Sequence, residues 1–255
     1  MTSPEPGVLA ARLPGLPPVE RVVVTPSGVE IVGFQADSDT ALTWWRRLRE
    51  VYPTSGRWPL LMDSDAGEYL EDPYTSATVE ESLAEAHTLD GAALLADTGR
   101  RWLAECSPEY AAELRAELAG QGTWPEEPEQ PGFGLRHDRG GRPEAITVAL
   151  VPAAEPWLVP VTLHYGGWNK YPSPAEHAAI MRHWLDRYGA EPVVWTGTTM
   201  DYAVARPPST RPEALALAWE YRHYNDGEYD LYRAETLTAL AGGLLNAPVW
   251  RMWWD

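Results

Sequence analysis

Residues 173–206 read SPAEHAAIMRHWLDRYGAEPVVWTGTTMDYAVAR, and this stretch decides the fold class because it predicts a helix followed by two strands. Ser173 and Glu176 form a capping box with a proline at the first helical position, a pattern that starts helices. Gly189 provides the residue that ends this helix. The β-branched and aromatic segments on either side of Gly197 then predict a β-hairpin.

The predicted helix has two distinct faces, because side chains three, four and seven residues apart point the same way. The apolar face is expected in the core and comprises His177, Met181, Trp184 and Tyr188. The polar face is expected in solvent and comprises Glu176, His183 and Arg187. We interpret His177 as a core residue rather than a metal ligand, because His183 lies too far round the helix to share a site with it.

Further elements surround this unit on both sides. They are two strands before the helix, then two helices and a final strand after the hairpin, over residues 146–151, 158–164, 210–224, 234–242 and 249–254. The order predicted for residues 145–255 is therefore β-β-α-β-β-α-α-β. In the final strand Trp250 and Trp254 point to one side and Trp253 to the other, so we expect this strand to be covered on both faces.

The N-terminal half predicts a β-β-α-β order followed by two or three helical pieces. These elements are a hairpin over 21–34, a helix from Asp39 to Tyr52 capped by Asp39, a strand over 58–62 and helices within 78–119. In the last helix Tyr110, Leu114 and Leu118 form an apolar stripe. Together the two halves predict an α+β protein with a mixed β-sheet and flanking helices.

Composition divides the chain into four parts. They are a flexible Pro-rich lead over 1–18, an N-terminal α+β region over 19–119, a Pro/Gly/Glu-rich stretch over 120–144 and a C-terminal domain over 145–255. The stretch over 120–144 has no sustained periodicity, which is typical of a linker or a long loop. Both alternatives stay open at this point.

Charge limits the classes of partner. The 255 residues include 20 Lys+Arg and 37 Asp+Glu, a formal net charge of −17, which repels nucleic acids and anionic membranes. One cysteine cannot form an internal disulfide, and residues 1–18 lack the features of a signal peptide, so we expect a cytoplasmic protein. No familiar cofactor motif is found in the sequence, and no cofactor or metal is expected.

A set of short segments is distinctive in combination. The segments are GRWPLL (56–61), Gly167-Trp168-Asn169, WLDRYGA (184–190), ARPPST (205–210), ALALAWE (214–220) and WRMWWD (250–255). From about residue 20 onward the chain resembles bacterial proteins that carry domain of unknown function 4253. This resemblance implies a compact α+β domain in a cytoplasmic protein, and it supplies no activity, substrate or site residue.

The helix that begins after Thr210 is apolar almost all round, yet it carries Glu220 between apolar positions. Burying a carboxylate costs free energy unless it is paired. The functional interpretation is a general acid or base, or a group that binds a ligand at the floor of a pocket. The structural alternative is an ion pair with Arg206, Arg222 or Lys170 that fixes the packing.

Two turns supply the other candidate residues. Residues 166–170 place Trp168 and Asn169 beside the single lysine of the chain, where binding groups are common. The alternative is a turn stabilised by Asn169 with Trp168 in the core. Residues 225–230 hold Asp226 and two further carboxylates, which could bind a hard cation or form a solvated turn.

Two classes of function follow. The first is a non-enzymatic module that recognises a basic protein or peptide, as an immunity or accessory protein would, supported by the net charge of −17 and the lack of a catalytic motif. The second is an enzyme or small-ligand binder. Its predicted site comprises Trp168, Asn169, Arg206, Glu220 and Asp226.

Overall fold

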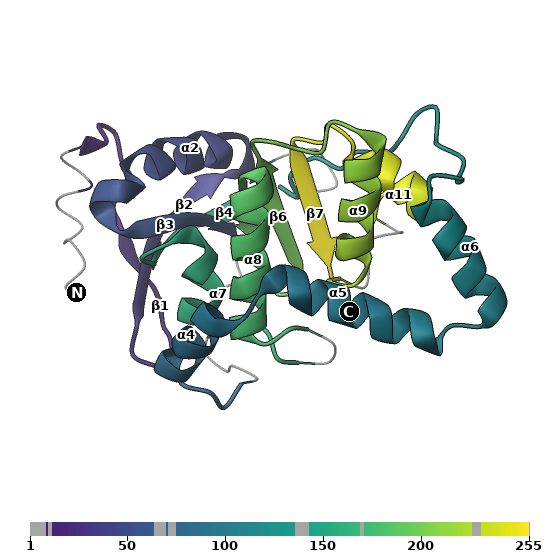
Figure 1. Ribbon diagram of the computed structural model, residues 1–255. Coiled ribbons are helices and arrows are strands. Elements are labelled where there is room, and N and C mark those ends of the chain that lie inside the picture. The colour runs from purple at the N-terminus through teal and green to yellow at the C-terminus, as the bar shows by residue number, and fades with distance from the viewer. Residues whose placement is uncertain are drawn as a thin grey trace.

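The computed structural model describes residues 9, 12–63, 70, 75–135, 143–168, 171–225 and 231–254 (Figure 1). In chain order the elements are β1 (Glu20–Val24), β2 (Glu30–Asp37), α2 (Ser38–Ser55), β3 (Arg57–Met62), α4 (Val79–Thr88), α5 (Gly91–Glu105), α6 (Pro108–Leu118), β4 (Ala145–Pro152), η1 (Pro156–Leu158), α7 (Val159–Leu163), α8 (Pro174–Tyr188), β5 (Ala190–Trp195), β6 (Thr199–Val204), α9 (Arg211–Arg222), α11 (Leu237–Leu244) and β7 (Val249–Trp253). The predicted α+β class with flanking helices is confirmed.

The strands form one seven-stranded mixed sheet with the order β1-β2-β4-β3-β5-β6-β7. Neighbouring strands are antiparallel except β3 and β5, which run parallel. Strand β4 lies between β2 and β3, so the N-terminal and C-terminal parts of the chain share this sheet.

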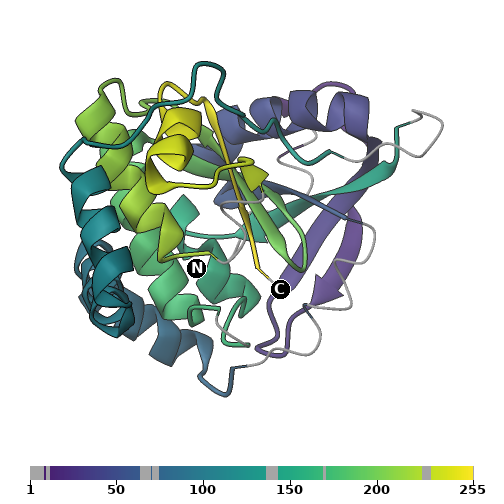
Figure 2. The same ribbon diagram turned by 90° about the vertical axis from the view of Figure 1, so that its right-hand side faces the viewer.

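Different helices cover the two faces of the sheet. Trp184 of α8 packs edge-on against Tyr202 of β6 and Trp250 of β7, with ring centroids 6.4 and 5.9 Å apart. Successive side chains of a strand point to opposite faces. The neighbours Ala203 and Val249 therefore point away from α8, and they line a pocket with residues of α2. Figure 2 shows the teal and green helices gathered on one side of the strands, with α2 apart from them.

Helix ends follow local sequence signals. The Ser173 and Thr210 side chains accept hydrogen bonds from the backbone N–H groups of Glu176 and Glu213, whose carboxylates bond back to the N-cap backbone. Helix α8 ends at Gly189, where φ is 63° and a left-handed conformation favours glycine. The predicted apolar face of α8 is fully buried.

Two predictions for the C-terminal part are wrong. Residues 158–164 belong to η1 and α7 instead of a strand, because Pro160 cannot donate to a sheet ladder but suits the first turn of a helix. The order there is β-α-α-β-β-α-α-β. Strand β7 is the last in the sheet, and Trp253 is only half-buried while Trp250 is fully buried, so β7 is completely covered on one face only.

Two details of the N-terminal half also differ from prediction. Asp37 occupies the N-cap of α2, and Asp39 lies within the first helical turn. Tyr110 and Leu118 of α6 are 38% and 37% exposed, so Leu114 is the part of the predicted stripe that packs inward. The short α6 lies at the edge of the molecule in Figure 1, which explains its narrow buried face.

The described part of the predicted loop, residues 120–135, is fixed to the body of the protein. Gln130 donates a hydrogen bond of 3.0 Å to a carbonyl at the end of α11. The guanidinium of Arg211 lies 4.9 Å from the ring centroid of Trp124. These contacts hold the segment that brings Phe133 against β6 and β7.

A helix that spans a membrane requires roughly 20 predominantly apolar residues. Within the described ranges, no helix is long and apolar enough to cross a bilayer.

Candidate functional site

Glu220 lies at the contact between α9 and α8. One carboxylate oxygen accepts hydrogen bonds from Trp184 Nε1 at 2.8 Å and from His183 Nε2 at 3.2 Å. The other oxygen lies 3.5 Å from a guanidinium nitrogen of Arg187. The Glu220 side chain is 15% exposed, so its charge is largely removed from water and compensated by α8. This geometry joins the two helices.

The partners of Glu220 differ from those expected. An ion pair with Arg206, Arg222 or Lys170 was the structural alternative. Lys170 lies outside the described residues. The ion-pair partners that the structure shows are His183 and Arg187, both on α8. The face of α8 that carries His183 was expected in solvent. This face is partly covered because residues of α9 contact it. The sequence pattern within α8 alone does not reveal such a contact with another helix.

Arg206 lies at the C-terminal end of α8. Its guanidinium donates hydrogen bonds to the carbonyl oxygens of Leu185 and Asp186 at 3.3 and 2.9 Å. Carbonyls in the last turn of a helix lack intrahelical donors, and a cation there also interacts favourably with the helix dipole. In this structure Arg206 therefore stabilises the end of a helix.

Trp168 belongs to an aromatic cluster that also contains Tyr165, Tyr171, Tyr224 and Trp254. Its ring centroid lies 5.0 Å from that of Tyr165 and 3.9 Å from that of Tyr171. Asn169 and Asp226 lie outside the described residues, as does the rest of the acidic turn after residue 225. The described candidates Trp168, Arg206 and Glu220 thus have different neighbours and are not brought together by the contacts above.

A buried histidine lies at the centre of the aromatic cluster. His177 is 0% exposed, and its Nδ1 lies 2.6 Å from the Tyr224 hydroxyl oxygen. Within the described residues its Nε2 has no hydrogen-bond partner. Burial lowers the pKa of His177 to about 3, so the imidazole is neutral at pH 7. This placement confirms the expectation of a core residue.

A buried ion pair that the sequence alone did not predict joins two neighbouring strands. Asp201 of β6 is 0% exposed and accepts two hydrogen bonds of 2.9 Å from the Arg251 guanidinium of β7. Asp201 Oδ2 also accepts a hydrogen bond of 2.6 Å from the backbone N–H of Gly134. Burial raises the pKa of Asp201 to about 6, and Arg251 opposes this shift. The signal in the sequence is a charged residue of each sign inside an apolar strand.

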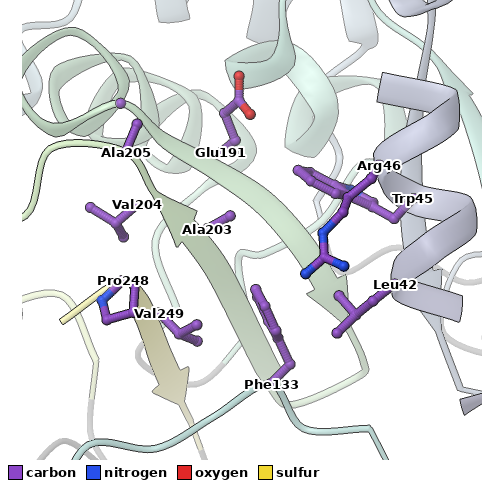
Figure 3. Close-up of a pocket in the computed structure, with 11 residues that line it drawn as sticks. Leu42, Trp45, Arg46, Phe133, Glu191, Ala203, Val204, Ala205, Pro248 and Val249 are labelled. Carbon is purple, nitrogen blue, oxygen red and sulfur yellow. The ribbon is translucent and has the colours of Figure 1, made fainter. Parts of the chain in front are cut away.

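A pocket of about 400 Å³ opens on the face of the sheet opposite α8. It lies between α2, the segment that ends residues 120–135, and strands β5 to β7 (Figure 3). Most of its lining is apolar and includes Leu42, Trp45, Phe133, Ala203 and Val249. No sequence motif predicts this pocket, because its walls come from segments far apart in the chain.

Two charged side chains line the pocket, and only one of them is compensated. Glu191 accepts hydrogen bonds of 2.9 and 2.6 Å from the guanidinium of Arg49. The Arg46 side chain makes no hydrogen bond or ion pair with any other residue that the structure describes. In Figure 3 its guanidinium points toward Phe133 and Leu42, and the Glu191 carboxylate points away from it. The pocket therefore presents one uncompensated positive charge.

The lining of the pocket is poor in reactive side chains. It contains no serine, threonine, cysteine or histidine that could act as a nucleophile or a general base. Its carboxylate, Glu191, is held by a bidentate arginine contact. Among the described residues, no group of three or more His, Cys, Asp and Glu side chains could hold a metal ion.

Comparison with known proteins gives a family match for the C-terminal part of the chain. Residues 147–255 match the family model described as Domain of unknown function (DUF4253). The match covers the Glu220 contact, the His177 cluster and the Asp201–Arg251 pair, whereas α2 and Phe133 lie before it. The resemblance expected from about residue 20 is thus shown from residue 147 onward. No curated protein and no solved structure matches the chain.

Proposed function

We propose that this chain, which carries a DUF4253 domain over residues 147–255, is a non-catalytic protein that binds a small organic molecule. The observation that carries the proposal is the apolar pocket between α2 and strands β5 to β7. Small-ligand binding was one of the two classes expected from the sequence. Of the predicted residues that the structure describes, Trp168, Arg206 and Glu220 do not line this pocket.

The size and the lining of the pocket suit a compact apolar ligand. Its volume of about 400 Å³ falls in the range of roughly 300–1,000 Å³ that is typical of small-molecule sites. The rings of Trp45 and Phe133 lie among its lining groups and offer flat apolar surfaces. Burying apolar area contributes about 25 cal/mol per Å², so a ligand of one or two rings gains several kcal/mol.

Fluorescence of the neutral dye N-phenyl-1-naphthylamine tests this proposal. We expect saturable binding of one dye per chain. Ala203→Phe should abolish it, because Ala203 lines the pocket and a phenyl group there would fill the cavity. Leu42→Trp fills the same space from α2 and is the second blocking variant. Ala112→Phe, at an exposed position of α6, is the matched control and should bind as wild type does.

Dye binding that does not depend on the pocket would refute the proposal. Dye fluorescence that does not saturate, or that persists unchanged in both folded blocking variants, would exclude the pocket as a binding site. Circular dichroism of each variant shows whether the fold is intact. A loss of binding in the Ala112→Phe control would equally contradict the assignment, because that residue lies on α6 and does not line the pocket.

A second function is favoured by the charge alone. A net charge of −17 supports recognition of a basic protein or peptide, and this function is compatible with ligand binding in the pocket. Such a complex should weaken steeply with salt, because exposed charges are screened beyond about 8 Å at physiological ionic strength. Partner capture that persists unchanged in 1 M salt (about 3 Å screening length) would contradict this electrostatic basis.

A further inference from the structure

We propose that the ligand of this pocket is an organic anion whose acidic group pairs with Arg46. The inference rests on the proposed function and specifies its ligand class. The ligand would be a compound with a compact apolar body and one carboxylate or sulfonate. The body would lie against Phe133 and Trp45, and the acidic group would face the guanidinium.

The charges around the pocket support this class. Acidic residues outnumber basic ones by 37 to 20 in the chain, yet Arg46 has no acidic partner among the described residues. The nearby acid, Glu191, is already neutralised by Arg49, whose closest nitrogen lies 2.6 Å from its carboxylate. An anion entering the pocket therefore meets one free guanidinium and no free carboxylate from the lining.

The hydrogen-bonding groups of arginine narrow the class of anion that the pocket would bind. A guanidinium has five N–H donors in a planar arrangement and forms two parallel hydrogen bonds with a carboxylate or a similar oxyanion. One arginine matches one acidic group. A polyanion would gain little more at this pocket and would be repelled by the net charge of −17. The predicted ligand is therefore a monoanion with an apolar body.

A matched pair of dyes tests the inference. The anionic dye 8-anilinonaphthalene-1-sulfonate has the same ring system as N-phenyl-1-naphthylamine plus one sulfonate. We expect wild type to bind the anionic dye about tenfold more tightly, equivalent to about 1.4 kcal/mol. Arg46→Met should remove this difference, so that the two dyes bind with similar affinity. Arg115→Met removes the same charge from the exposed face of α6 and should behave as wild type does.

Arg49 offers an independent test of the electrostatic argument. Arg49→Met would free the Glu191 carboxylate and place an uncompensated negative charge at the pocket wall. It should weaken the anionic dye severalfold and leave the neutral dye unchanged, although Arg49 itself does not line the pocket. Equal weakening of both dyes would indicate a change in pocket shape and would contradict the inference.

The outcomes separate this inference from the function on which it rests. If both dyes bind equally and Ala203→Phe blocks them, the pocket binds ligands but the anion preference is overturned. If Arg46→Met and Arg115→Met weaken the anionic dye equally, the effect belongs to overall charge and the inference fails. If neither dye shows binding that Ala203→Phe blocks, the proposed function itself fails.

Discussion

Replacing His177 with glutamine should remove a defined part of the acid sensitivity of this protein. The His177 imidazole, carried by α8, is buried among the rings of Tyr224, Tyr165 and Trp254. Burial lowers its pKa to about 3, against 6.5 for an exposed histidine. Between these two values the unfolded chain takes up a proton that the folded chain does not, so acid favours unfolding.

The magnitude follows from the difference between the two pKa values. The contribution of neutral His177 to stability is fully present above pH 6.5 and is lost progressively as the pH falls toward 3. Each pH unit below 6.5 costs about 1.4 kcal/mol. Lowering the pH from 8 to 5 should therefore reduce the free energy of unfolding by about 2 kcal/mol through this residue.

Urea unfolding at pH 8 and at pH 5 measures this difference. The loss of stability on acidification should be about 2 kcal/mol smaller in His177→Gln than in wild type, whatever the absolute stability of the variant. His87→Gln removes an exposed imidazole and serves as the matched control, which should keep the wild-type loss. Equal losses in wild type and His177→Gln would show that a buried, neutral His177 does not cause the acid sensitivity.

Two further substitutions test the contacts between elements. Asp201→Asn should destabilise the protein by about 3 kcal/mol in urea unfolding, because it leaves the partly buried Arg251 without its counter-charge; an unchanged midpoint would contradict a structural role for the pair. Glu220→Gln keeps an acceptor for the Trp184 N–H, so it should lower the free energy of unfolding by less than about 1 kcal/mol in thermal unfolding. Glu220→Leu removes that acceptor and should lower it by about 1–3 kcal/mol. Neither Glu220 variant should change dye affinity, and weaker binding in Glu220→Gln would instead support a ligand-binding role for that carboxylate.

The sequence predicts well those elements that depend on neighbouring residues. The capping boxes at Ser173 and Thr210 and the glycine at 189 mark helix ends through bonds within a few residues. The apolar run that contains Pro160 was predicted as a strand because its β-branched residues suit both states. Pro160 suits the first turn of a helix, and packing against β4 and α8, which is tertiary information, holds that helix in place.

The candidate site depends on distant segments and could be predicted only in part. That Glu220 turns inward follows from the apolar character of α9, but its partners His183 and Arg187 depend on how α9 crosses α8. The pocket needs α2, Phe133 and three strands to meet, and the isolated residues carry no motif. The sequence does not distinguish Arg46 from other surface arginines. The distinction requires the positions of Arg49 and of the acidic residues around the pocket.

The position of β4 in the sheet has a consequence during protein synthesis. Strands β2 and β3 leave the ribosome well before Ala145–Pro152, the strand that lies between them. Until then each has an edge whose backbone N–H and C=O groups are free to pair with other chains. The nascent chain is therefore most exposed to aggregation until about 150 residues have left the ribosome and β4 can pair with both strands.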